Sequence, residues 1–267
     1  MPNKYLSKRN FEVSENKKNT ESMSMEQAKS LFQNELKENI DEGLEHEEKI
    51  EISEQFIEKF PCEREEAIHI AFDNLPKEFV NALEVHKDNL TVNTSSGREG
   101  CYYFENGVYM RGDLSNDEYA EVMRHEISHY LDEQKGWCSE KIDYINAVYD
   151  DTMRINFSDS STKELRAEML DELFGGDVCY NRHVSDILSA VSRNDPRLIF
   201  RYNIEGVPYY RHKNEYFDKG HNKENEIYAD VMACIGENDS ETLEFLKKYF
   251  PNTYEETIKT LKEEYDE

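Results

Sequence analysis

Apolar residues recur at helical spacing along most of this 267-residue chain, and only a short central stretch has a pattern typical of strands. Phe56, Ile57 and Phe60, for example, are apolar positions of one predicted amphipathic segment that Pro61 ends. Helices are predicted at about 25–39, 47–60, 63–74, 77–85, 116–135, 141–150, 162–174, 183–192, 224–235, 240–250 and 252–264.

Strands are predicted where β-prone residues gather between turn signals, at 90–92, 101–104 and 108–110. Asn106-Gly107 joins the last two of these segments, and this dipeptide strongly favours a hairpin turn. The pattern therefore predicts an α+β fold that is mostly helical, with a small mixed sheet.

Breaking residues set the remaining boundaries. Gly236 is predicted to stop the helix 224–235, and Asp195–Tyr216, which contains Pro196, Gly206 and Pro208, is predicted to form short strands or loop. Three regions follow from composition and pattern: a disordered polar N-terminus at 1–23, an acidic helical region at 24–74 and a larger α+β domain at 75–267.

The predicted helix 116–135 carries a metal-binding motif. Ser115-Asn116-Asp117-Glu118 is a capping box that starts this helix, and Gly136 ends it. The helix contains His125, Glu126 and His129, which form an H-E-x-x-H sequence. Histidines four residues apart lie on one helical face, so their imidazoles can bind one Zn²⁺ at about 2.0–2.1 Å. The intervening glutamate can then take a proton from water.

An ordinary surface helix can carry the same spacing by chance. The preceding hairpin favours the zinc interpretation, because zincin peptidases place an edge strand beside their active-site helix. Val108–Met110 is the predicted edge strand, which would hold a peptide substrate as an added strand. The fold prediction is accordingly a zincin-like one, with the sheet beside the active-site helix.

The third ligand comes from elsewhere in the chain. Metzincins require Gly at position 132 and His at 135, whereas Asp132 and Lys135 stand there, so that class is excluded. Glu226 in Glu226-Ile227-Tyr228-Ala229-Asp230 fits the gluzincin pattern. Asp230, one turn later, can accept the Nδ1–H of His125 or His129.

Alternatives to this ligand set remain. Glu226 can instead be an exposed residue of an ordinary amphipathic helix. Asp132 is the second candidate ligand, or it holds a backbone or histidine proton, or is merely solvated. No ligand-like spacing involves the remaining histidines, which are predicted to be surface or core residues: His46, His69, His86 and His183.

An ordered set of motifs resembles the zincin domains of phage minor head proteins, which look like the catalytic domain of anthrax lethal factor. The resemblance covers roughly residues 75–260 and includes the hairpin, H-E-x-x-H-x-x-D, Val184–Ala190, Glu226-x-x-Ala-Asp and Lys247–Tyr254. It implies that a tyrosine upstream of Glu226 stabilises the oxyanion, and His212-x-x-x-Tyr216 occupies that place. Tyr216 is the candidate, with Tyr209 and Tyr210 close by, and His212 is a weaker one.

Composition excludes some partners. The formal net charge of −26 argues against nucleic acid and anionic membranes, which require a basic surface. The chain has no apolar run long enough for a membrane span and no secretory signal, and its five scattered cysteines are typical of a reducing compartment. A cytoplasmic or virion-associated location is therefore expected.

The predicted function is a zinc-dependent endopeptidase that acts on a protein or peptide substrate. Two alternatives stand beside it. One is a phage head or morphogenesis component whose zincin domain does not cleave, with the N-terminal helices as a surface for a phage head or other protein partner. The other is an effector or toxin protease.

Overall fold

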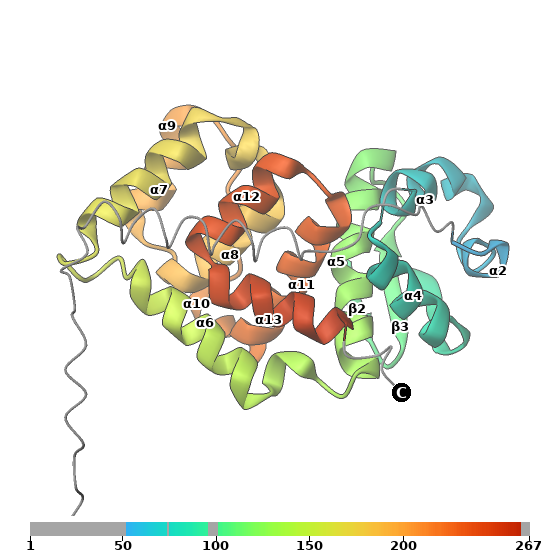
Figure 1. The fold of residues 1–267 in the computed structure, drawn as a ribbon. Coiled ribbons are helices and arrows are strands. Elements are labelled where there is room, and N and C mark those ends of the chain that lie inside the picture. The colour runs from blue at the N-terminus through green and yellow to red at the C-terminus, as the bar shows by residue number, and fades with distance from the viewer. Residues whose placement is uncertain (1–51, 74, 96–100, 263–267) are drawn as a thin grey trace, which may run out of the picture. The chain divides into compact units, whose positions relative to one another are not determined.

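The computed structural model describes residues 52–73, 75–95 and 101–262, which all belong to one compact unit, Leu44–Glu267. Predictions for residues 1–51 lie outside this described part. The described residues are mostly helical with one small sheet, so the predicted α+β class is confirmed (Figure 1).

The helices are α2 (Glu54–Ile57), α3 (Glu65–Phe72), α4 (Lys77–His86), α5 (Asn116–Gln134), α6 (Ile142–Arg154), α7 (Lys163–Gly175), α8 (Arg182–Ser192), α9 (Pro196–Glu205), α10 (Asn214–Phe217), α11 (Asn222–Glu237), α12 (Ser240–Tyr249) and α13 (Pro251–Lys262). The strands are β1 (Thr91–Ser95), β2 (Tyr102–Phe104) and β3 (Gly107–Arg111).

The sheet has the order β1-β3-β2, with β1 parallel and β2 antiparallel to β3. The hairpin turn comes one residue earlier than predicted, because Glu105 and Asn106 have φ of 48° and 62°. Gly107 already belongs to β3, where an added Cβ would lie 2.9 Å from the Tyr109 ring.

The prediction that Val108–Met110 is the edge strand is wrong. These residues lie in the central strand, because β1 pairs with one side of β3 and β2 with the other. The strand at the edge beside α5 is β2.

The helix α5 has the predicted ends. Ser115 and Glu118 form the reciprocal hydrogen bonds of a capping box, and Gly136, with φ of 74°, follows the last turn. Its apolar face, with Ile127, Tyr130 and Leu131, is fully buried. The helix packs most extensively against α11, which in turn packs against α8 (Figure 1). This arrangement brings residues from three distant parts of the chain together.

Two predicted boundaries around α11 and α9 are wrong. Gly236 lies inside α11, where an added Cβ would be 3.2 Å from Arg124 Cδ, so glycine permits close packing on α5. Asn238, in the left-handed conformation, follows the end of the helix instead. The segment predicted as strands or loop contains α9, because Pro196 occupies its first turn and the Asp195 side chain caps it.

The described part of the predicted region 24–74 belongs to the same unit as the rest. Within 52–60 only α2 is helical, but α3 packs against α5. Arg64 reinforces this junction by donating a hydrogen bond to the carbonyl of Leu114, just before α5 begins. None of the described helices combines the length and apolar composition needed to cross a bilayer.

Candidate metal centre

The two central helices bring the predicted metal ligands together. His125 and His129 project from α5, and their Nε2 atoms lie 3.2 Å apart. Glu226 projects from α11, and its Oε2 lies 3.3 Å from His125 Nε2 and 3.7 Å from His129 Nε2. All three side chains are at least 85% buried, so Glu226 is not an exposed helix residue.

The spacing of these donor atoms fits a single zinc ion. Bonds of about 2.0–2.1 Å in tetrahedral geometry place ligand atoms about 3.3 Å apart. The observed separations of 3.2, 3.3 and 3.7 Å are close to this value. Glu226 Oε2 is buried and has no hydrogen-bond partner, which would be unfavourable unless a cation completed the site.

Charge around the site also favours a cation. Burial by itself would raise the pKa of Glu226, but the imidazoles of His129 and His125 hold it well below its usual value. Burial would lower the pKa of His125, but the carboxylates of Asp230 and Glu226 raise it well above its usual value. Protons and a metal ion would therefore compete for His125.

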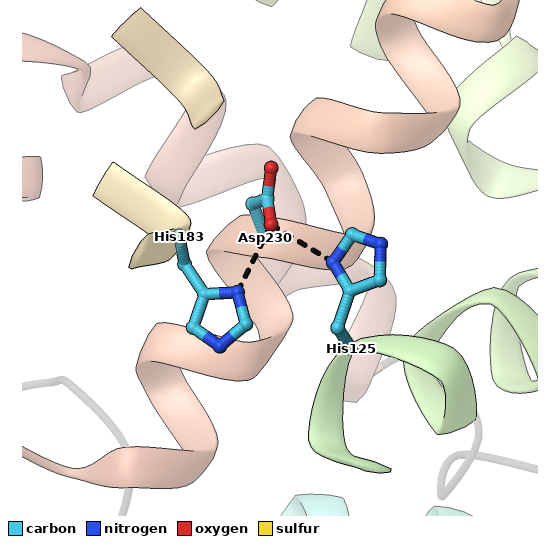
Figure 2. Close-up of side chains that lie close together, drawn as sticks. All are labelled: His125, His183 and Asp230. Carbon is cyan, nitrogen blue, oxygen red and sulfur yellow. Dashed lines mark hydrogen bonds and ion pairs between the residues drawn. The ribbon is translucent and has the colours of Figure 1, made fainter. Parts of the chain in front are cut away.

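Asp230 orients His125 through the ring nitrogen that points away from the donor atoms, Nδ1. Its Oδ1 accepts a hydrogen bond from His125 Nδ1 at 2.8 Å, so the His125 lone pair at Nε2 faces the site. Figure 2 shows that the same carboxylate lies between two imidazoles, because His183 Nδ1 also contacts Oδ1, at 3.0 Å. Metal-bound histidines in proteins commonly have such a carboxylate partner, which fixes their tautomer.

A cleft of about 700 Å³ opens onto these donor atoms. Glu126 lines it together with His125, His129 and Glu226. Burial raises the pKa of the Glu126 carboxyl, while His125 and His129 oppose the increase. A carboxylate whose pKa is raised by burial is suited to accept a proton and then release it.

Tyr216 and His212 also line the cleft, and they come from the segment between α9 and α11. The Tyr216 hydroxyl donates a hydrogen bond to Glu226 Oε1, and burial raises its pKa, so it keeps its proton. His212 stacks on the Tyr216 ring at 4.5 Å and contacts Asp186 Oδ2 at 3.0 Å. Both tyrosine and histidine thus present donors near the predicted ligands.

Asp132 does not join the donor set. Its carboxylate accepts hydrogen bonds from the backbone N–H and the hydroxyl of Ser139 and is fully buried. Among the described residues, the clusters able to share a metal ion do not include it. Of the roles predicted for Asp132, the structure shows the one in which its carboxylate accepts a backbone N–H. This hydrogen bond connects the end of α5 to the turn that follows it.

Three residues near the site are not among the site residues that the sequence predicts. His183 is predicted to be a surface or core residue; it lies in the core, and its Nδ1 contacts Asp230 Oδ1 at 3.0 Å, a contact that the sequence does not predict. Asp186 pairs with His212, and Arg182 lines the cleft with its guanidinium 4.6 Å above the Tyr210 ring. All three lie in the first half of α8, and the i, i+3 spacing of His183 and Asp186 on this apolar helix is a sequence signal that these two side chains face the core.

Comparison with known proteins adds no relative. No protein-family model matches the chain, and neither the curated proteins nor the solved structures contain a significant match. The interpretation of the site therefore depends on its own geometry.

Proposed function

We propose that this protein is a zinc-dependent endopeptidase whose metal ligands are His125, His129 and Glu226. The observation that carries the proposal is the set of three converging donor atoms, 3.2 to 3.7 Å apart, one of which has no other partner. Two imidazoles and a carboxylate are the ligands of many catalytic zinc sites.

A zinc ion bound there would polarise a peptide carbonyl and lower the pKa of water to about 7. Glu126 is the proposed general base, which accepts a proton from the attacking water and delivers it to the leaving amine. Tyr216 is the proposed donor to the oxyanion that develops on the carbonyl. This second role requires its hydroxyl to leave Glu226 Oε1 when substrate binds.

The open cleft favours catalysis over a purely structural zinc. Structural zinc sites are usually closed by four protein ligands, whereas catalytic sites have three and an open position. Here the three predicted ligands and Glu126 all line the same cleft. This observation supports the peptidase over a morphogenetic protein with a non-catalytic domain.

The substrate would bind in an extended conformation beside β2. Tyr102 and Tyr103 in this edge strand, and Cys101 just before it, line the cleft that contains the donor atoms. An extended peptide can add to a sheet edge through its backbone and place its scissile bond near Glu126. The proposal therefore moves the substrate strand from the predicted Val108–Met110 to β2.

The test is Glu126→Gln, assayed with a quenched-fluorescent peptide library and with zinc analysis. The variant should bind zinc as the wild type does but lose cleavage by about 10²–10⁴-fold, the usual contribution of a general base. Glu140→Gln, an exposed substitution outside the cleft, is the matched control and should change neither property. Chelation should abolish wild-type cleavage, and zinc should restore it.

Two outcomes would contradict the proposal. Full cleavage by Glu126→Gln would remove this glutamate as the base. Unchanged zinc content in both His129→Ala and Glu226→Ala would remove the ligand set. Zinc binding without cleavage of any library peptide would favour the non-catalytic alternative.

A further inference from the structure

A second group of potential metal ligands lies beyond Asp230, outside the residues that line the cleft. It consists of Glu121 on α5, His183 on α8 and Glu237 on α11. One donor atom from each lies within 4.8 Å of the others. We define these three residues as the rear cluster. It joins α8 to α5 and α11, the two helices that carry the proposed catalytic ligands.

His183 directs an unpaired nitrogen into the rear cluster. Its side chain is 1% exposed, and its Nδ1 lies 3.0 Å from Asp230 Oδ1 (Figure 2). An ionised carboxylate only accepts hydrogen bonds, so Nδ1 carries the proton and Nε2 of the neutral ring presents a lone pair. His183 Nε2 is buried and has no hydrogen-bond partner. Asp230 thus orients His183 as it orients His125.

The lone pair of His183 faces another acceptor. Glu237 Oε1 lies 3.6 Å from His183 Nε2, which is too long for a hydrogen bond. A lone pair opposite a carboxylate oxygen is unfavourable in a buried environment unless a cation lies between them. The separation of 3.6 Å is close to the spacing of about 3.3 Å between two zinc ligands.

The charge balance leaves room for a cation. Arg124 donates a hydrogen bond to Glu237 Oε1 at 3.3 Å, but it also donates hydrogen bonds to the carbonyls of Ile70 and Ala71. Burial raises the pKa of Glu121 to about 7, with Arg182 opposing the increase and Glu237 adding to it. The Glu121 carboxylate forms no ion pair with a described residue, so its charge is not directly neutralised there.

We propose that the rear cluster binds a second divalent transition-metal ion through His183 Nε2, Glu121 and Glu237. One imidazole nitrogen and two carboxylate oxygens suit Zn²⁺ and also Mn²⁺. Glu121 is half-buried, so its side chain can move towards the other two donors. An ion in this position cross-links α5, α8 and α11 and stabilises the arrangement of His125, Asp230 and Glu226. The proposal does not depend on peptidase activity.

Zinc stoichiometry tests the proposal on the full chain. Protein freed of metal by chelation is loaded with Zn²⁺, separated from excess ion by gel filtration and analysed for zinc per chain. The wild type should retain two ions. His129→Ala should retain one, and Glu237→Gln and Glu121→Gln should each retain one. Glu244→Gln, an exposed substitution on α12, is the control for loss of one charge and should retain two.

Each outcome is decisive for one of the two sites. A single ion per wild-type chain that is lost in His129→Ala and retained by Glu237→Gln would overturn the second site, as would two ions retained by both Glu237→Gln and Glu121→Gln. One ion that persists in His129→Ala but is lost in Glu237→Gln would uphold the rear cluster and overturn the catalytic ligand set. Far-ultraviolet circular dichroism identifies any variant that fails to fold. If both glutamine variants fail, the wild type and His129→Ala together still decide the question, because the rear cluster requires one ion to remain in His129→Ala.

Discussion

The hydroxyl of Tyr216 donates a hydrogen bond to Glu226 Oε1 and leaves Oε2 of the same carboxylate facing the two histidines of α5. The two oxygens of Glu226 therefore have different contacts: Oε1 accepts the phenol hydrogen bond, and Oε2 faces the histidines. The phenol orients Oε1, while Oε2 is buried without a hydrogen-bond partner and is the oxygen proposed to bind the metal ion.

Replacing Tyr216 with phenylalanine separates two roles of its hydroxyl. If the hydroxyl stabilises the oxyanion, kcat should fall by about 10²–10³-fold with a similar KM, because one such donor contributes that much. Zinc affinity should stay nearly unchanged. If the hydroxyl only orients Glu226, zinc affinity should fall by about 10–100-fold instead. Tyr210→Phe, in the same cleft but without contact to Glu226, is the control, and steady-state kinetics with a zinc competition assay distinguish the outcomes.

Asp230→Asn tests the support of His125. The amide keeps the shape of the side chain but can no longer accept two Nδ1–H groups as an anion, so the His125 ring loses its fixed tautomer. Zinc affinity should fall by about 10–100-fold, as for other carboxylate partners of metal-bound histidines. Competition with a chromophoric chelator measures it. Zinc affinity equal to that of the wild type would show that Asp230 has no part in metal binding.

The pair of His212 and Asp186 should make stability depend on pH. Burial by itself would lower the pKa of His212, but Asp186 and Glu226 raise it to about 9, above the value of about 6.5 expected in the unfolded chain. A raised pKa means that the stabilisation is fully present below about pH 6.5 and is lost as the pH rises through about 9.

Thermal unfolding of the metal-free protein checks this dependence. The difference in Tm between the wild type and His212→Gln should be largest near pH 6 and vanish near pH 9.5. Because the His212 side chain is 38% exposed, the effect should stay below about 1 kcal/mol, or a few degrees. His221→Gln, an exposed neighbour, should show no such trend. A constant difference across the range would contradict the prediction.

Asp151 is expected to stabilise the fold at a distance from the cleft. Its buried carboxylate accepts hydrogen bonds of 2.8 Å from the Asn252 amide and from the backbone N–H and hydroxyl of Thr253, at the start of α13. Asp151→Ala leaves these donors without an acceptor and should lower the free energy of unfolding by about 1–3 kcal/mol. Asp150→Ala, which is exposed, should change it by less than about 0.5 kcal/mol.

Urea unfolding monitored by circular dichroism provides the measurement for both aspartate variants. Zinc binding should be unchanged in folded Asp151→Ala, because Asp151 does not line the cleft. An unfolding midpoint for Asp151→Ala equal to that of Asp150→Ala would show that the capping contacts to α13 contribute nothing.

Local sequence signals predicted the parts of the protein that depend on neighbouring residues. The capping box at Ser115 and Glu118 and the stop at Gly136 set the ends of α5, because both act through backbone groups within one turn. The i, i+4 spacing of His125 and His129 places both imidazoles on one face of that helix. The hairpin and the α+β class also follow from short-range pattern, and so does the candidate role of Glu126.

Tertiary packing decided the rest. Sequence pattern does not specify which strands pair with β3, and the pairing of β1 and β2 with its two sides makes it the central strand. Glu226 was a candidate on its motif, but its distance to His125 depends on how closely α11 approaches α5, which Gly236 permits. His183 has no motif of its own, and its place beside Asp230 results from the packing of α8 on α11. Contacts between residues far apart in the chain arise from the burial of whole helix faces, and no local pattern specifies them.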